Sequence, residues 1–233
     1  MSKIYIDPGH GGKDPGAVKY VKERDVAVKV ADYMEKALEK YNVKTMQSTG
    51  TDSTVFRAIE ANRWGADLYV SIHFNAGGGD GYEALVHSKE NKELGQIFEK
   101  HVKSVGQNSR GIKYRPELNV LRYSNMPAIL NEIAFVDNQK DIKDWNEDKE
   151  LKKMGEALAK AAAEFLDLKI KEARYKIAVD SLNVRSGPGT HHKIMTTVKE
   201  GEVYTIIETS GSWGKLKSGA GWINVSEKYC KRM

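Results

Sequence analysis

The sequence predicts an α/β protein: an open, mostly parallel β-sheet flanked by helices, followed by a small all-β barrel. Over about the first 168 residues, short apolar runs alternate with stretches of helical spacing, which is typical of parallel strands joined by helices. Beyond residue 174 the helical spacing stops, and short segments rich in Val, Ile, Thr and Tyr alternate with glycine-containing turns. The length of 233 residues allows two such domains.

The elements of the first domain follow from apolar runs and from apolar residues spaced three and four apart. Strands are expected at 3–6, 43–47, 67–73, 82–87 and 127–133. Helices are expected at 24–40, 53–64, 91–105 and 148–167. The stretch 106–126 has no clear period and contains Gly111 and Pro116, so it is predicted to be a long loop. Long loops in compact domains usually serve a function.

The composition changes at residues 169–174, which we expect to link a first domain at 1–168 to a second at 175–233. Turn signals in the second domain lie at 186–189, 200–201, 210–212 and 218–221. Turns at this spacing predict a small β-barrel. Three aromatic residues could form a recognition platform, but in so small a barrel we expect them in the core: Tyr204, Trp213 and Trp222.

Polar residues stand where three of the expected strands end. His10 follows the first strand within the glycine-rich segment 7–12, His73 closes the third strand, and Glu132 closes the fifth. Because sites in open α/β sheets lie at the carboxyl ends of strands, these residues are expected to share one cleft. Taken alone, His73 could equally be a structural residue, whereas an unpaired Glu132 behind an apolar segment would be costly unless it met a cation, a metal or donors.

Together with Glu23, these residues fit a catalytic zinc site. Two histidines and one carboxylate supply about three protein ligands, and a further position stays open for water or substrate. A second carboxylate near the metal can take a proton from water and return it to the leaving amine. By itself Glu23 would be a solvated charge in the run 22–25, where Asp25 is the nearest alternative.

Five short motifs follow one another in the first 168 residues. Four of them occupy 6–12, 22–25, 71–76 and 131–135. The remaining one, third in order, consists of Arg57 and Asn62 followed by 66–68. In order and spacing they resemble the zinc-dependent N-acetylmuramoyl-L-alanine amidases (amidase type 3), which cut the amide between the lactyl group of muramic acid and the first alanine of the peptidoglycan stem. The resemblance implies a phosphorylase/hydrolase-like fold, a zinc cofactor and hydrolase activity.

Residue by residue, the resemblance implies that His10, Glu23 and His73 bind zinc and that Glu132 is the catalytic carboxylate. Phe74 stands where many relatives have a smaller residue, and we expect it to shape the substrate groove. The stretch 106–126 is expected to contact the glycan or the stem peptide. The remaining histidines are expected to be surface or structural residues: His87, His101, His191 and His192.

The second domain resembles the bacterial SH3-like domain over nearly all of 175–233, through 182–189, 201–203, 213–216 and 221–223. The resemblance implies that it binds cell-wall peptide or polymer. Residues 171–233 carry 11 Lys and Arg against 6 Asp and Glu, whereas residues 1–170 carry 26 of each. A basic module attracts polyanions such as phosphate-bearing wall polymers. Nucleic acid is not expected as a partner, because the basic residues are scattered and a zinc site has no role there.

The sequence also bears on where the protein acts. No charged segment followed by a signal-type apolar stretch opens the chain, so we expect synthesis in the cytoplasm and action on the wall after release. No transmembrane run is present, and the single cysteine, Cys230, is expected to be a free thiol. The expected partner is Gram-positive peptidoglycan, bound by both domains. The host, the wall ligand and the oligomeric state stay open.

These observations favour a phage endolysin, and they leave alternatives. A sporulation mother-cell autolysin of the same activity fits the same facts. A zinc endopeptidase that cuts within the stem or cross-bridge would share the metal chemistry but release other amino termini. A catalytically silent wall-binding protein is disfavoured by the intact set of four candidate residues.

Overall fold

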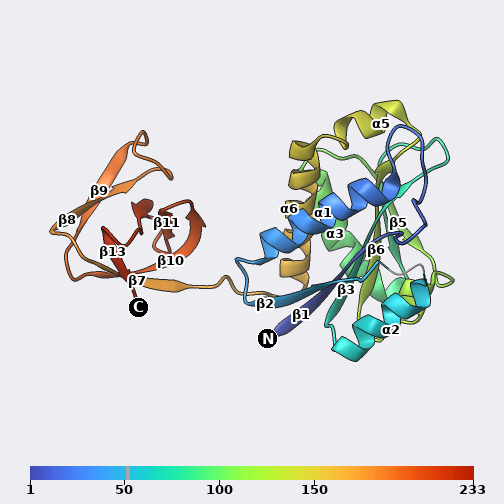
Figure 1. Cartoon of the computed structure of the whole chain (residues 1–233), viewed down its shortest axis with the longest axis horizontal. Helices are drawn as coiled ribbons and strands as arrows, with labels where there is room; N and C mark the ends of the chain where they lie inside the picture. The colour runs from blue at the N-terminus through green and yellow to red at the C-terminus, as the bar shows by residue number, and fades with distance from the viewer. Residues whose placement is uncertain (51–52) are drawn as a thin grey trace. The chain divides into compact units, whose positions relative to one another are not determined.

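The computed structural model describes residues 1–50 and 53–233, and the chain forms two compact units, Met1–Lys169 and Ile170–Met233. Figure 1 traces both units along the chain. Each has a hydrophobic core of its own.

The first unit is built on a six-stranded sheet with the order β2-β1-β3-β6-β4-β5. All neighbouring strands are parallel except β4 and β6, which are antiparallel. The strands are β1 (Ser2–Pro8), β2 (Val43–Gln47), β3 (Leu68–Asn75), β4 (Tyr82–Val86), β5 (Ser109–Tyr114) and β6 (Ala128–Phe135). The prediction of an open, mostly parallel sheet is confirmed. Since β4 runs against β6, it begins at the edge where β1, β3 and β6 end.

Helices cover both faces of this sheet (Figure 1). On one face, α1 (Glu23–Leu38) and α3 (Lys92–Ser104) both contact α6 (Asp148–Phe165) over the larger core. On the other face, α2 (Thr54–Trp64) packs with the short α4 (Asn119–Arg122) over a smaller core. Two short helices complete the unit: η1 (Lys89–Asn91) and α5 (Gln139–Asp144). Alternate residues of the central strands enter the two cores, as the period of two along a strand requires.

The prediction of a long loop at 106–126 is wrong, because this stretch contains β5 and α4. The reason is physical: β5 is an edge strand whose residues are all at least partly exposed, so it carries no apolar pattern. Its ladder with β4 is also interrupted by a register shift next to Glu83. A four-residue helix such as α4 is too short to show a helical period.

The second unit is an all-antiparallel sheet of seven strands with the order β13-β7-β10-β11-β12-β8-β9. The strands are β7 (Ala173–Ile177), β8 (Ser181–Arg185), β9 (Ile194–Lys199), β10 (Val203–Ser210), β11 (Trp213–Leu216), β12 (Trp222–Asn224) and β13 (Cys230–Arg232). Trp222 is buried, Tyr204 packs against the core, and Trp213 is partly exposed. Cys230 is a free, buried thiol.

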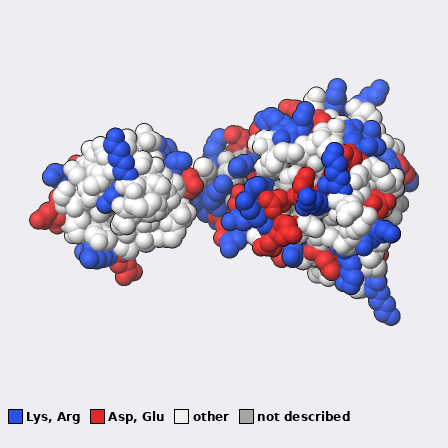
Figure 2. All heavy atoms as spheres, turned by 90° about the horizontal axis from the view of Figure 1, so that it is seen from above, with Lys and Arg blue, Asp and Glu red and all other residues white. Residues whose placement is uncertain are grey.

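Charges of both signs are interspersed over the surface of the first unit that faces the viewer in Figure 2. This agrees with its equal numbers of basic and acidic residues. Among the helices that the structure describes, none combines the length and the apolar character needed to cross a membrane.

Candidate active site

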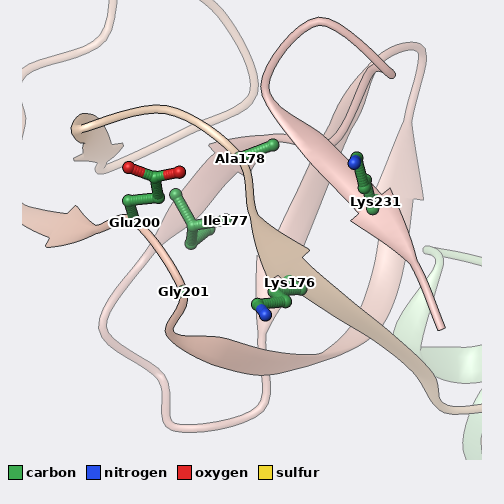
Figure 3. Close-up of a pocket in the computed structure, with 6 residues that line it drawn as sticks. All are labelled: Lys176, Ile177, Ala178, Glu200, Gly201 and Lys231. Atoms are coloured by element: carbon green, nitrogen blue, oxygen red, sulfur yellow. The ribbon is translucent and has the colours of Figure 1, made fainter.

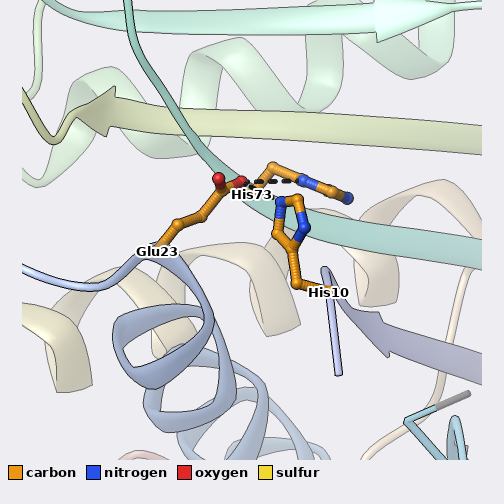
Figure 4. A group of neighbouring side chains, drawn as sticks. All are labelled: His10, Glu23 and His73. Atoms are coloured by element: carbon orange, nitrogen blue, oxygen red, sulfur yellow. Dashed lines mark hydrogen bonds and ion pairs between the residues drawn. The ribbon is translucent and has the colours of Figure 1, made fainter. Parts of the chain in front are cut away.

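Three of the four predicted site residues meet at the edge where β1 and β3 end (Figure 4). His10 lies just beyond β1 with a left-handed backbone, φ 65°. His73 belongs to β3, and Glu23 is the first residue of α1. They come from three separate elements, so only the fold brings them together.

The Glu23 carboxylate lies between the two imidazoles. Its Oε1 is 2.9 Å from His10 Nε2 and 2.9 Å from His73 Nδ1, and one donor atom from each residue lies within 4.8 Å of the others. The two rings meet edge to face with centroids 4.9 Å apart. Two imidazole nitrogens and a carboxylate oxygen are the donors and the number that a hydrolytic zinc site uses.

Electrostatics favours an ionised Glu23. Burial by itself would raise the pKa of Glu23, but hydrogen bonds from His10 and His73 outweigh it and hold this pKa well below its usual range. Backbone amides of Ala17 and Phe74 also donate to the carboxylate, at 2.9 and 3.1 Å. Conversely, the hydrogen bond to Glu23 raises the pKa of His10 to about 9 against the opposing effect of burial. The cluster therefore holds an ionised carboxylate that favours a positive charge next to it, either a protonated histidine or a bound cation.

Asp14 orients the His10 ring from behind. Its Oδ2 is 2.7 Å from His10 Nδ1, which leaves Nε2 directed at Glu23. A carboxylate on the second nitrogen is the usual partner of a metal-binding histidine, since it fixes the ring and its tautomer. The sequence reasoning missed Asp14, although its position four residues after a candidate ligand was the available signal.

Two glycines make room for the cluster. A Cβ atom on Gly9 would lie 2.4 Å from the His73 ring, and one on Gly16 would lie 2.6 Å from both Glu23 Oε2 and His10 Cδ2. Gly16 also has φ +68°, a conformation that side chains rarely adopt. The backbone thus approaches the three side chains as closely as glycine alone permits.

A buried ion pair supports the loop that carries His10. Arg57 of α2 donates to Asp7 Oδ1 at 2.8 Å, to the Pro8 carbonyl at 3.0 Å and to the His10 carbonyl. The other Asp7 oxygen accepts from Tyr69 at 2.7 Å and from Ser71 at 2.9 Å. The clamp joins β1, β3 and α2, which explains the presence of Arg57 in one of the sequence motifs.

Glu132 lies next to the cluster, on the neighbouring strand β6. In the parallel ladder of β3 and β6 it is the direct partner of His73, so both side chains lie on one face of the sheet. Its Oε2 atom is buried and has no hydrogen-bond partner within residues 1–50 and 53–233. Burial raises the pKa of Glu132 to about 7. A buried oxygen without a partner is rare in folded proteins and calls for a functional explanation.

The other motif residues have different positions. Asn62 binds the segment after α4, donating to the Tyr123 carbonyl at 2.7 Å and accepting from the Asn125 amide at 2.9 Å. The expectation that Phe74 shapes the substrate groove is wrong: its side chain is buried in the larger core, because alternate residues of a strand face opposite sides. Asp25 points outward, 57% exposed, and stands outside the cluster.

The fold and this donor set define an α/β protein with a candidate metal centre of the kind that hydrolytic enzymes use. Residues 4–164 match the family model described as N-acetylmuramoyl-L-alanine amidase, and the chain belongs to that family. Residues 180–229 match the bacterial SH3 domain model. Peptidoglycan is the substrate that this membership assigns to the protein.

Named relatives agree with this assignment. The chain is 36% identical over 187 residues to the endolysin of Bacillus phage SPP1, covering 73% of this chain and 69% of the relative. It is 34% identical over 197 residues to the amidase CwlM of Bacillus licheniformis, covering 80% and 78%. The solved amidase from Clostridium difficile 630 superposes with a TM-score of 0.67 at 32% identity, covering 71% of this chain and 97% of that one.

Proposed function

We propose that this protein hydrolyses the amide between N-acetylmuramic acid and L-alanine with a zinc ion held by His10, Glu23 and His73, and with Glu132 as the catalytic carboxylate. The observation that carries the proposal is the convergence of three donor side chains next to a buried carboxylate oxygen without a partner. The family match supports the bond that is cut.

The residues of the site fit zinc. The donors are two imidazoles and one carboxylate, and Asp14 and two backbone amides already hold the ligands from behind. When bound, zinc lowers the pKa of a coordinated water to about 7 and polarises a carbonyl group.

Glu132 supplies the proton transfer. Opposite His73 on the same face, it can accept a proton from the attacking water and give it to the nitrogen of the leaving alanine. Its Oε2 has no competing partner among the described residues, so it is available for this exchange. Because the leaving amine must lie beside Glu132, the stem peptide extends from the metal ligands towards β6 and β4.

The test is digestion of purified Gram-positive peptidoglycan before and after chelation, with zinc added back, followed by mass spectrometry and amino-terminal analysis. The proposal expects chelator-sensitive release of stem peptides that begin with alanine. Other new amino termini would assign a peptidoglycan endopeptidase instead. Wall binding without cleavage would leave a targeting protein.

We further propose that both domains, residues 1–168 and 175–233 joined by 169–174, bind the wall. A pocket of about 500 Å³ in the second unit supports this proposal (Figure 3). Its lining includes Lys176 and Lys231, which oppose each other directly on β7 and β13. Like charges in this position repel each other unless an anion lies between them, and the excess charge of the chain lies in this unit.

Cosedimentation with walls tests this second proposal. Lys176→Glu with Lys231→Glu should lower binding to untreated walls more than to walls stripped of phosphate polymers. Lys193→Glu with Lys228→Glu changes the net charge equally at two exposed lysines outside the pocket lining, so it is the matched control. Equal loss in the double variant and the control would reduce the effect to overall charge.

For its setting, we propose a phage endolysin that acts on the wall after release from the cytoplasm. The SPP1 endolysin supports this, whereas a sporulation-specific amidase of Bacillus subtilis, 31% identical over 198 residues, keeps the autolysin alternative in view. The timing of expression distinguishes the two settings. Appearance of the protein late in phage infection supports the endolysin, whereas appearance only in sporulating cells supports the autolysin.

A further inference from the structure

Beside Glu132 lies an ion pair, Glu83 with Arg110, to which the reaction assigns no role. Resting on the proposed function, we propose that Arg110 binds the carboxylate of the stem-peptide residue that follows the first alanine. Arg110 would then be a specificity-determining residue that distinguishes an acidic from an amidated stem.

The register of the sheet places this pair next to the site. His73 in β3 is opposite Glu132 in β6, and Glu132 is opposite Glu83 in β4. The three side chains therefore form one row on one face, across strands about 4.8 Å apart. Arg110 belongs to β5, the next strand, and its Nε donates to Glu83 Oε1 at 2.7 Å. The row of functional side chains thus ends in a cation.

The contacts of Arg110 hold it in place and leave it accessible. Its guanidinium carbon lies 5.3 Å from the ring centre of the buried Phe135. Glu83 is itself fixed, since its Oε2 accepts from Asn75 Nδ2 at 3.3 Å. Glu83 is only 13% exposed, whereas the Arg110 side chain is 43% exposed. Within the described ranges, Glu83 is the one carboxylate that Arg110 contacts.

The remaining donors of Arg110 suit a second carboxylate. A guanidinium offers five N–H groups in a planar fork, and the contact with Glu83 through Nε leaves the terminal amino groups for a two-point interaction. Because Glu83 already neutralises the charge of the arginine, a further anion is held mainly by the geometry of the fork. This favours a planar carboxylate over a neutral amide at that position.

The direction of the substrate leads to the same place. The leaving nitrogen must lie beside Glu132, so the peptide continues along the row towards Glu83 and Arg110. Two strand spacings separate β6 from β5, about 10 Å, and an extended peptide advances about 3.3 Å per residue. Because Arg110 reaches back to Glu83, its guanidinium covers part of that distance. The carboxylate one residue beyond alanine is the first anionic group within its reach.

The competing explanation is that Arg110 only neutralises the charge of Glu83. Without Arg110, an unpaired Glu83 carboxylate would then lie next to Glu132. In that case Arg110 would be a positioning residue, and its loss would impair cleavage of every substrate. Direct recognition impairs only the substrate with the carboxylate. A pair of substrates that differ in this one group separates the two explanations.

The experiment uses synthetic N-acetylmuramoyl-L-alanyl peptides with D-glutamate or its α-amide as the second residue. The zinc-loaded wild type should cleave the acid with the higher kcat/KM. Arg110→Ala should lower kcat/KM for the acid roughly tenfold to a hundredfold, mainly through KM, and change the amide substrate less than about twofold. Arg110→Lys keeps the charge without the planar fork, so its kcat/KM for the acid should lie between those of the wild type and Arg110→Ala.

Arg115→Ala is the matched control, since this arginine just beyond the other end of β5 pairs with Glu117 and is similarly exposed. Binding of both peptides to Glu132→Gln by calorimetry is the readout that does not depend on turnover. If the acid binds more tightly than the amide, and Arg110→Ala abolishes this difference, the inference is supported. Cleavage at another bond would then overturn the proposed function but not the inference. Equal losses for acid and amide, or no preference in the wild type, would overturn the inference.

Discussion

Glu132 and His73 are direct partners in the parallel ladder of β6 and β3. His73 contacts Glu23 in the donor cluster, whereas Glu132 has a buried oxygen without a hydrogen-bond partner in the described part of the chain. A fixed register of the sheet therefore sets the spacing between His73, the proposed metal ligand, and Glu132, the proposed proton carrier. Backbone hydrogen bonds determine that spacing, so changes at either side chain should affect chemistry before they affect the fold.

The first prediction is that Glu132→Gln abolishes most of the cleavage activity and leaves the fold intact. The amide has the same shape but cannot carry the proton, so cleavage should fall a hundredfold or more, the scale of general acid–base catalysis. Zinc content and circular dichroism should match the wild type. Glu90→Gln, on the exposed helix η1, is the control for loss of one carboxylate. Near-normal activity in Glu132→Gln would remove it from the mechanism.

Zinc content should depend on Glu23 and not on its neighbour Asp25. Glu23→Gln removes the charge of the proposed ligand at the centre of the cluster, whereas Asp25→Asn alters an outward-facing side chain. We expect metal analysis after dialysis to show loss of zinc in the first variant and about one equivalent in the second. Retention of zinc and activity in Glu23→Gln would contradict the ligand assignment.

Gly16→Ala should disturb the site more than an equally strained glycine elsewhere. Gly16 and Gly65 have φ values of +68° and +71°, but a Cβ atom on Gly16 would lie 2.6 Å from Glu23 Oε2, whereas one on Gly65 would lie 3.7 Å from its nearest neighbour. Both variants should lose about 1 kcal/mol or more of stability from backbone strain. Only Gly16→Ala should also lower zinc affinity, which competition with a chromophoric chelator measures.

The sequence alone predicted the sheet, its central strands and the two histidines of the donor cluster, because strands buried on both faces show continuous apolar runs. The strand ends then locate His10, His73 and Glu132. The edge strand β5 escaped notice because it buries neither face. The pair of Glu83 with Arg110 escaped with it, since its importance depends on a strand order that puts β4 between β6 and β5.

Glu23 shows the limit of residue patterns. In the run 22–25 nothing distinguishes it from its charged neighbours, and only the resemblance selected it. The structure supplies the physical reason: the start of α1 turns this residue inward, where the backbone amides of Ala17 and Phe74 donate hydrogen bonds to its carboxylate. Such long-range contacts leave no periodic signal in the chain.

Cys230 should be inert in the native protein. It is 2% exposed, and burial raises the pKa of its thiol to about 11. Since the thiolate is the reactive form, a raised pKa means little reactivity at pH 8, and reactivity should grow only as pH approaches the raised value. A chromogenic disulfide reagent should label it slowly in buffer and fully in urea. Rapid labelling at pH 8 in buffer would show that the second unit opens locally.

Arg57→Ala should unfold the loop of His10 as well as weaken the first unit. Arg57 and Asp7 are 3% and 1% exposed, and removing one partner leaves an uncompensated buried charge, at a cost of about 3–5 kcal/mol. Urea unfolding should show that loss, and zinc binding should fall with it because the Pro8 and His10 carbonyls lose their donor. The double variant Arg57→Met with Asp7→Asn removes both charges, so it should recover stability but not zinc affinity. If it recovered both, the clamp would serve the core of the sheet and not the metal loop.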